Sequence, residues 1–200
     1  MKKISCLLLA AGESNRMGKK NKLLLPIAGK SLVRRTSEEL LKFSFFEILV
    51  VTGHQHELVQ NEIRDLPVRI AHNKNFQTGM HGSIREGLNQ SRVAQADGFV
   101  ICLSDQPLFN INLVEKLSDV FIKNSKAQIV FPVVAGKKGH PVMISKHYIP
   151  EILLETDGDH GCQYLFKRHP YNLVPVEVED PSIFIDVDTP EQYAEYREAL

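Results

Sequence analysis

A glycine-bounded loop near the start of the chain carries the residue types that bind polyphosphates. The apolar run Ile4–Leu9 leads into this loop, which extends from Gly12 to Gly18. Four cations occur within seven positions in and after it: Arg16, Lys19, Lys20 and Lys22. Backbone N–H groups beside glycine can approach an anion closely, and the cations can neutralise it. The spacing matches neither the P-loop pattern GxxxxGK[ST] nor the dinucleotide fingerprint GxGxxG. The loop therefore predicts a polyphosphate site of a different kind.

Acidic residues near the ends of two other apolar runs can supply a metal site. Asp105 comes soon after Phe99–Leu103, where an unpaired carboxylate would be costly to desolvate. Opposite a phosphate cradle its natural partner is Mg²⁺, which takes one or two carboxylates together with phosphate oxygens and waters. Asp186 and Asp188 are two residues apart, so on a strand they would face the same side. The alternative is that both acidic segments cap the helices that follow them.

The other charged and titratable residues have simpler interpretations. The position of Arg16 and Lys22 in and after the glycine loop favours ligand binding, whereas Lys19 and Lys20 are expected to be solvated. The sequence contains neither HExxH nor GxSxG, which disfavours a zinc protease or a serine hydrolase. Polar loop positions are therefore expected for His54, His56, His72, His81 and His140.

Composition limits the class of protein. The 200 residues are 43% apolar and 24% charged, with 24 basic and 24 acidic residues and no net charge. This balance predicts one globular domain spanning 1–200, with no reason to bind nucleic acid or a membrane. No segment approaches the ~18 apolar residues of a membrane span. Cys6, Cys102 and Cys162 are far apart and form no CxxC, so neither a disulfide nor a zinc site is expected and the cytoplasm is the expected location.

Strand-like and helix-like segments alternate along the first two-thirds of the chain. Apolar runs of strand length are Ile4–Leu9, Glu47–Val51, Val68–Ala71, Gly98–Leu103 and Gln128–Val134. Helical patterns lie between them at Ser31–Phe43, His54–Ile63, His81–Ser91 and Asn112–Lys123. The last third adds two strands and three helices: Gly139–Ile144, Leu173–Val178, Tyr148–Leu154, Gly161–Arg168 and Pro190–Leu200. This order predicts an α/β fold with a doubly wound, mostly parallel sheet.

Ligands of open α/β sheets bind beyond the carboxyl ends of the strands. Four predicted strands are followed by polar or glycine-rich segments: the basic loop, Thr52-Gly53-His54, the segment that runs to Gln77–Ser83, and Ser104–Pro107. We expect these four segments to converge on one edge of the sheet.

These motifs, in this order, resemble the MobA-like nucleotidyltransferases, and within them most closely the molybdenum cofactor cytidylyltransferases. The resemblance begins with Leu9-Ala10-Ala11-Gly12-x-Ser14-x-Arg16-Met17-Gly18 and Lys22-Leu23-Leu24-Leu25. It continues through Val51–His54, Gly79-Met80, Ser83, Ser104–Pro107, Gly139–Pro141, Gly158-Asp159-x-Gly161 and Asp186-x-Asp188-Thr189-Pro190. It therefore covers nearly the whole chain.

The resemblance implies a nucleotide-sugar-transferase-like, Rossmann-like fold. It also implies transfer of CMP from CTP to the terminal phosphate of molybdopterin, with release of pyrophosphate. The implied catalytic residues are Arg16, Lys22 and Asp105. The implied nucleotide-binding residues are Leu9, Ala10, Ala11, Gly12, Arg16, Lys22, Thr52, Gly53, Gly79, Ser83 and Asp105. Asp105 and Asp188 would bind Mg²⁺, with Mn²⁺ as an alternative. The acceptor would contact Gly139, His140, Pro141, Gly158, Asp159 and Gly161.

Within this family alanine at Ala11 favours a cytosine nucleotide, whereas guanylyltransferases carry glycine there. The chain departs from the family pattern at Gly82, where relatives commonly have serine, and at Cys162-Gln163, where they often have Ala-Arg. A monomer that passes its product to a molybdenum hydroxylase is the expected assembly.

Two other functions remain open: a nucleotidyltransferase of this fold acting on a sugar or polyol phosphate, and a non-catalytic carrier of the finished cofactor. A nicotinamide-dependent oxidoreductase is disfavoured because GxGxxG is absent.

Overall fold

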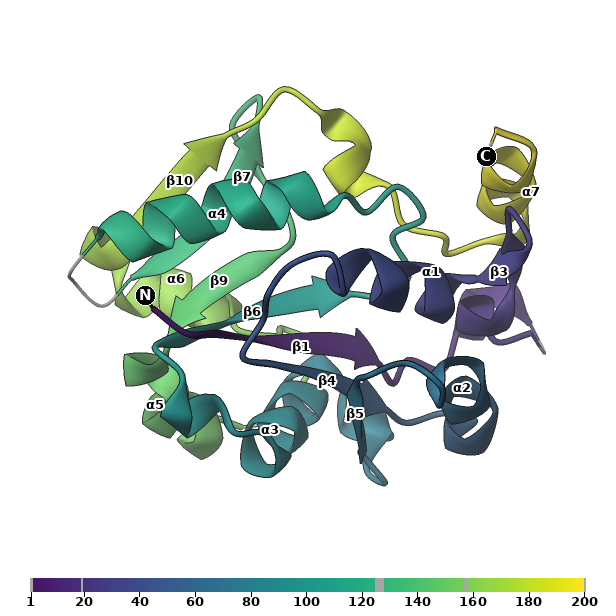
Figure 1. Ribbon diagram of the computed structural model, residues 1–200, viewed down its shortest axis with the longest axis horizontal. Coiled ribbons are helices and arrows are strands. Elements are labelled where there is room, and N and C mark those ends of the chain that lie inside the picture. The colour runs from purple at the N-terminus through teal and green to yellow at the C-terminus, as the bar shows by residue number, and fades with distance from the viewer. Residues whose placement is uncertain (1, 19, 125–127, 157, 200) are drawn as a thin grey trace.

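The computed structural model describes residues 2–18, 20–124, 128–156 and 158–199. Its main sheet has the order β10-β7-β9-β6-β1-β4-β5, with β8 paired to β7 (Figure 1). Its strands are β1 (Ile4–Ala10), β4 (Glu47–Thr52), β5 (Arg69–His72), β6 (Gly98–Leu103), β7 (Ile129–Val134), β8 (Lys137–Lys138), β9 (Val142–Ser145) and β10 (Leu173–Glu177). Only β8 and β9 run antiparallel to their neighbours. The sheet is mostly parallel, as the sequence predicts.

Helices cover both faces of the sheet because alternate residues of each strand point to opposite sides. In β1, Cys6 and Leu8 face a cluster formed with α1 (Leu32–Leu40), α2 (His56–Ile63) and α4 (Ile111–Lys123). Leu7 and Leu9 face the opposite cluster, formed with α3 (Met80–Gln90), α5 (Ile149–Leu154) and α6 (Gln163–Arg168). All seven residues of β1 are buried, which explains its nearly continuous apolar sequence.

A small third cluster ties the C-terminal helix to the N-terminal third of the chain. The hairpin of β2 (Pro26–Ile27) and β3 (Lys30–Ser31) packs beside α7 (Pro190–Ala199). Ile27 and Val187 are fully buried there, and the Tyr193 hydroxyl donates to the Pro26 carbonyl at 2.8 Å. The segment before α7 is therefore held close to the glycine loop that precedes the hairpin.

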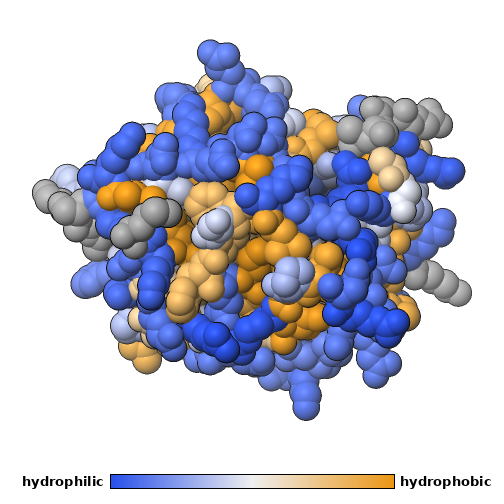
Figure 2. Space-filling view, in the orientation of Figure 1, coloured by the Kyte–Doolittle hydropathy of each residue, from blue (hydrophilic) through white to orange (hydrophobic). Residues whose placement is uncertain are grey.

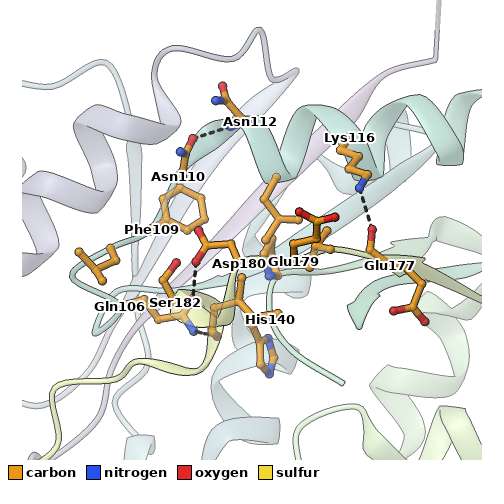
Figure 3. A pocket seen from close by; sticks show the side chains of 15 residues that line it. Gln106, Phe109, Asn110, Asn112, Lys116, His140, Glu177, Glu179, Asp180 and Ser182 are labelled. Carbon is orange, nitrogen blue, oxygen red and sulfur yellow. Dashed lines mark hydrogen bonds between the residues drawn. The ribbon is translucent and has the colours of Figure 1, made fainter. Parts of the chain in front are cut away.

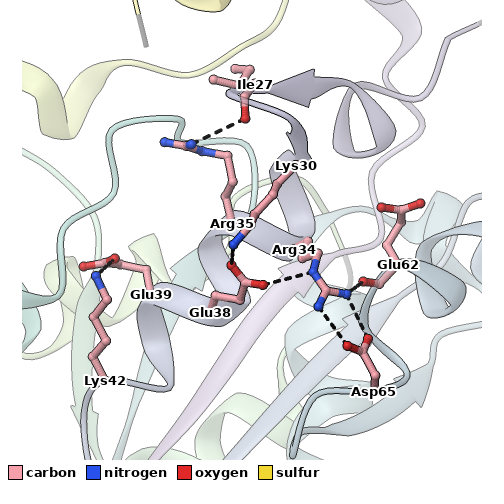
Figure 4. Close-up of polar contacts among 9 residues, drawn as sticks. All are labelled: Ile27, Lys30, Arg34, Arg35, Glu38, Glu39, Lys42, Glu62 and Asp65. Carbon is pink, nitrogen blue, oxygen red and sulfur yellow. Dashed lines mark hydrogen bonds and ion pairs between the residues drawn. The ribbon is translucent and has the colours of Figure 1, made fainter.

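Ion pairs fix α1 against the end of α2 (Figure 4). The Arg34 guanidinium contacts Glu38 at 3.0 Å and both carboxylate oxygens of Asp65 at 2.8 Å. It also donates to the Glu62 carbonyl. Bidentate geometry of this kind is more specific than an ordinary surface ion pair.

The fold prediction is confirmed, with two local differences. Strand β9 begins at Val142 rather than Gly139, after a cis peptide bond between His140 and Pro141. Asp186 and Asp188 lie in an irregular segment rather than on a strand, because the chain leaves the sheet after Glu177 and passes through a 3₁₀ turn at Pro181–Phe184.

Hydrophilic side chains cover most of the surface seen in Figure 2, and the apolar surface lies mainly in the centre of that view. Among the described residues, none of the helices has the length and apolar character needed to cross a membrane.

Candidate active site

A cavity of about 490 Å³ opens beyond the carboxyl ends of β1 and β6. Three of the four predicted strand-end segments contribute to it, as do the acidic residues before α7. Its lining comprises Leu9–Arg16, Lys22, Leu23, Phe76, Gln77, Gly79, Met80, Ser83, Leu103, Ser104, Asp105, Asp159, Asp186 and Asp188. The tertiary structure thus brings the basic loop and both acidic segments together.

The glycine loop is shaped by its own side chains. Ser14 adopts a left-handed conformation with φ 58°, and its hydroxyl accepts a hydrogen bond from the backbone N–H of Lys22 at 3.1 Å. This contact closes the loop and fixes the backbone of Lys22. A Cβ added to Gly12 would meet no atom within 4 Å, so the glycine leaves open space where a ligand can approach the backbone.

Lys22 lies between two carboxylates from distant parts of the chain. Its ammonium is 2.6 Å from Asp105 Oδ2 and 2.6 Å from Asp188 Oδ1, while Arg16 reaches Asp188 Oδ2 at 2.7 Å. Burial lowers the pKa of Lys22, but the attraction of Asp105 and Asp188 outweighs it, so the pKa is raised overall. Lys22 is therefore a cation at neutral pH.

A third carboxylate stands beside this pair. Burial, followed by repulsion from Asp105, raises the pKa of Asp186 to about 6. Asp105 Oδ1 and Asp186 Oδ1 are both buried without a hydrogen-bond partner. Carboxylate oxygens with spare lone pairs beside a bound ammonium form a donor set that fits a hard cation such as Mg²⁺ or Mn²⁺.

The described part of the chain holds no cluster of three or more His, Cys, Asp and Glu side chains arranged to hold a metal.

Backbone contacts hold Asp188 in place. The Val187 N–H donates to the Asp105 carbonyl at 2.9 Å. The Gln192 side-chain oxygen accepts from the N–H groups of Asp188 at 2.9 Å and Thr189 at 3.1 Å, and Thr189 Oγ1 accepts from the Gln192 N–H at 3.3 Å. This is a capping box at the start of α7. The segment therefore caps α7, as the alternative interpretation predicts, and it also places Asp188 in the lining of the cavity.

Four of the predicted nucleotide-binding residues divide into two groups. Gly79 and Ser83 line the cavity, and the Ser83 hydroxyl accepts from Asn73 Nδ2 at 3.1 Å. Thr52 and Gly53 do not line it: Thr52 is fully buried and donates to the Ala71 carbonyl. A Cβ on Gly53 would lie 2.8 Å from the Ala11 carbonyl oxygen, so Gly53 supports the loop from behind. The structure therefore places these two residues outside the cavity lining, and a nucleotide contact from them stays a prediction.

The predicted acceptor residues also separate. Asp159 lines the main cavity and accepts from the Met80 N–H at 3.2 Å. Gly158 and Gly161 present their carbonyls to the buried His81, through its backbone N–H at 2.9 Å and its ring Nδ1 at 3.0 Å respectively. The segment therefore docks on the start of α3.

His140 and Pro141 line a second cavity of about 560 Å³, between α4 and the segment after β10 (Figure 3). Gly139 packs closely under Ile183, to which a Cβ would come within 2.5 Å. Glu177, Glu179 and Asp180 give this cavity an acidic rim. His140 Nδ1 is buried without a hydrogen-bond partner, and burial lowers the pKa of this imidazole.

Several lining residues are absent from the sequence-based site: Glu13, Ser14, Asn15, Leu23, Phe76, Gln77, Met80, Leu103 and Ser104. The sequence offers one signal for them, since each lies next to or within a motif that contributes a predicted residue. Lys20 is exposed as expected, and Lys19 lies outside the described residues.

The chain is similar to curated proteins with different names. It is 26% identical over 196 residues to nicotine blue oxidoreductase of Paenarthrobacter nicotinovorans, covering 94% of each chain. It is 26% identical over 199 residues to the molybdenum cofactor cytidylyltransferase of Escherichia coli, covering 99% of this chain and 97% of that protein. A molybdenum cofactor guanylyltransferase of Shewanella is also 26% identical, over 192 residues, covering 94% of this chain and 92% of that one.

Solved structures share the fold. A nucleotidyl transferase from Methanothermobacter superposes with a TM-score of 0.84 at 20% identity, covering 98% of this chain and 97% of its own. A Mycobacterium tuberculosis protein in complex with manganese superposes with a TM-score of 0.79 at 21% identity, covering 99% of this chain and 100% of its own.

The model of the MobA-like NTP transferase domain matches residues 6–173, which include the glycine loop, Lys22 and Asp105. The chain therefore belongs to the MobA-like NTP transferase family and is a nucleotidyltransferase.

Proposed function

We propose that this nucleotidyltransferase transfers CMP from CTP to the terminal phosphate of molybdopterin and releases pyrophosphate. One observation carries the proposal: Lys22 and Arg16 form ion pairs with Asp105 and Asp188 in the lining of a cavity that also includes the Ala11-Gly12 loop. Cations for a triphosphate and carboxylates for its metal thus adjoin the same space.

The reaction needs no general base. A phosphomonoester has a second pKa near ~6, so the acceptor phosphate is largely ionised at neutral pH. It attacks the α-phosphorus of CTP in line, the bond to the β-phosphate oxygen breaks, and pyrophosphate departs with its negative charge. Arg16 and Lys22 neutralise that charge, and the loop backbone orients the triphosphate.

Asp105 and Asp188 are the residues that would hold a divalent cation. When bound, Mg²⁺ or Mn²⁺ supplies charge neutralisation at phosphate oxygens. The fit of the two carboxylates to a cation supports this role, because they already hold the ammonium of Lys22.

Ala11 supports CTP as the donor. Relatives named as cytidylyltransferase and guanylyltransferase are equally similar to this chain, so overall identity does not separate the two bases. Ala11 lines the cavity, and the family resemblance associates alanine at this position with a cytosine nucleotide.

The acceptor and the assembly belong to the same proposal. Molybdopterin is favoured by the family resemblance and by the cytidylyltransferase relative. We further propose that the protein acts as a cytoplasmic monomer and that a molybdenum hydroxylase receives its product.

A substrate panel tests the proposal. CTP, GTP, UTP and ATP are each combined with molybdopterin, a sugar phosphate or a polyol phosphate, with Mg²⁺ or Mn²⁺. Pyrophosphate release gives the rate, and mass spectrometry identifies the nucleotidyl product. We expect CTP with molybdopterin to give the highest kcat/KM. A preference for another donor or for a sugar phosphate would overturn the assignment within the family.

Two further outcomes would indicate another class of function. Pterin binding without consumption of any nucleotide would support a cofactor carrier. Because one relative is named as an oxidoreductase, oxidation of a reduced nicotinamide cofactor is measured in the same panel. Turnover of a nicotinamide cofactor in place of pyrophosphate release would contradict the proposal.

A further inference from the structure

The ammonium of Lys22 occupies the position between the two carboxylates that the proposed function assigns to a divalent metal. It is 2.6 Å from Asp105 Oδ2 and 2.6 Å from Asp188 Oδ1. The Lys22 side chain is 12% exposed and the two carboxylate side chains are 22% and 23% exposed. This is a largely desolvated three-group contact between segments 83 and 166 residues apart, rather than a surface ion pair.

The four oxygens of these two carboxylates differ in whether they have a partner. Asp188 has both oxygens engaged, Oδ1 by Lys22 and Oδ2 by Arg16. Asp105 has Oδ2 engaged by Lys22, while its buried Oδ1 has no hydrogen-bond partner. A divalent cation bridging both residues would therefore share at least one oxygen with the Lys22 ammonium or the Arg16 guanidinium, at a separation where two cations repel strongly.

Lys22 also has a second partner in the proposed function, because the triphosphate needs its positive charge. The ammonium has three N–H donors and the two carboxylates engage two of them, so binding several phosphate oxygens of the triphosphate draws it away from the carboxylates. The Ser14 hydroxyl anchors the backbone N–H of Lys22. The flexible four-carbon side chain must therefore carry the ammonium from the carboxylates to the triphosphate.

We propose that Lys22 is an exchangeable resident cation of the metal site. It holds Asp105 and Asp188 together in the ligand-free protein, and it transfers to the triphosphate when a divalent cation takes its place. The inference rests on the metal site of the proposed function, but not on which base or acceptor the enzyme uses.

The exchange has a thermodynamic consequence. Metal alone must displace Lys22 into solvent, whereas metal that arrives with a triphosphate provides Lys22 with a new anionic partner. Metal and nucleotide therefore bind more tightly together than separately, and by linkage each strengthens the other by the same factor.

Mn²⁺ binding without nucleotide tests the exchange. The probe is Mn²⁺ alone, and the free ion is measured by its electron paramagnetic resonance signal in wild type, Lys22→Met and Lys20→Met. Methionine keeps a long unbranched side chain and removes the charge. Lys20 is exposed and two positions away, so Lys20→Met controls for the loss of one positive charge from the same segment.

We expect Lys22→Met to bind Mn²⁺ about fivefold or more tightly than Lys20→Met, within the usual range of coupling between linked sites. The same variant should bind the CTP–Mn²⁺ complex more weakly than wild type, so one substitution changes the two affinities in opposite directions. Equal Mn²⁺ affinity in Lys22→Met and Lys20→Met would overturn the proposal, because a purely structural Lys22 does not compete with the metal.

A second measurement uses the wild-type protein and so does not depend on the folding of a variant. A short pulse of acetic anhydride labels accessible amines, and mass spectrometry gives the labelling of Lys22 relative to Lys20. Mg²⁺ alone should increase the relative labelling of Lys22 at least about twofold, as expected when a linked equilibrium shifts. Unchanged labelling at Mg²⁺ concentrations that saturate the site would contradict the exchange. The measurement with Mn²⁺ alone and the labelling with Mg²⁺ alone contain no nucleotide, so failure of the CTP assignment leaves both results interpretable.

Discussion

Lys22 Nζ lies 2.6 Å from Asp105 Oδ2, although the two residues are 83 positions apart and belong to segments after different strands. The parallel pairing of β1 with β6 brings these segments to the same edge of the sheet. Each residue neutralises the other in the ligand-free protein, and each is assigned a different part of the metal–triphosphate complex in the proposed function.

Loss of either charge should nearly abolish turnover. We expect Lys22→Met and Asp105→Asn to lower kcat by about 10²–10³, the usual effect of removing one group that stabilises transition-state charge. Initial rates of pyrophosphate release at saturating CTP and Mg²⁺ provide the measurement, and circular dichroism checks the fold. Lys20→Met is the matched control. A rate within a few-fold of wild type in either variant would remove that residue from the catalytic set.

Ala11→Gly should shift the choice of nucleotide base. The Ala11 methyl group packs closely against Gly53, because a Cβ added to Gly53 would lie 2.9 Å from it. The backbone behind Ala11 therefore has little room to shift. Removing one methyl group from a pocket changes discrimination by about 10–200-fold at most. We expect the ratio of kcat/KM for CTP over GTP to fall about tenfold. An unchanged ratio would place base selection elsewhere in the cavity.

Asp186→Asn should stabilise the protein at neutral but not at acidic pH. The folded pKa of Asp186, about 6, is above its ordinary value of 3.8, so the folded state retains a proton that the unfolded state releases. Wild-type stability therefore falls as pH rises between these values, and the loss persists above pH 6. After allowance for solvent screening, the variant should gain on the order of 1 kcal/mol at about pH 7 and almost nothing at about pH 4.

Denaturant unfolding without metal at those two pH values measures this difference. Glu179→Gln serves as the control, because Glu179 is an exposed acid in the same connecting segment, before the 3₁₀ turn. A gain that is the same at both pH values would show that the ionisation of Asp186 is not its cause.

Gln192→Ala should weaken the metal site from outside it. The Gln192 side chain accepts hydrogen bonds from the N–H groups of Asp188 and Thr189, and its loss removes part of the cap of α7. We expect a loss of about 1 kcal/mol in stability and a higher Mg²⁺ concentration for half-maximal activity. Gln192→Glu retains an acceptor and should restore the Mg²⁺ dependence. If both variants require the same Mg²⁺ as wild type, the cap does not position Asp188.

Gly79→Ala should disturb the acceptor side of the site. Gly79 has φ +93°, and a Cβ would lie 2.6–2.9 Å from backbone atoms of Gly158 and Asp159. Gly29 has a similar φ of +80° but open space around it, so Gly29→Ala measures the backbone strain alone. We expect Gly79→Ala to be less stable than Gly29→Ala by about 1–3 kcal/mol, and to raise the acceptor KM more than the CTP KM. Equal effects on both KM values would argue against an acceptor role for Gly158–Gly161.

The sequence by itself determined the fold class and pointed to the candidate phosphate-binding residues. Buried parallel strands are apolar along their whole length, so runs such as Ile4–Leu9 and Gly98–Leu103 mark their own positions. The glycine loop and its cations are contiguous in the sequence. Local spacing alone therefore predicts Arg16 and Lys22 as phosphate-binding residues. The capping box at Thr189 and Gln192 is also a local signal.

Only the tertiary structure decided which distant residues share a cavity. Thr52 and Gly53 have the composition of a binding turn, but the packing of β4 behind the glycine loop buries them. His140 and Asp159 come from motifs with similar expected roles, yet they line different cavities. Asp186 and Asp188 reach the site without a strand, because α7 anchors on the β2–β3 hairpin and carries the preceding segment with it. Such placements depend on contacts between segments that are far apart in the sequence, which local spacing does not encode.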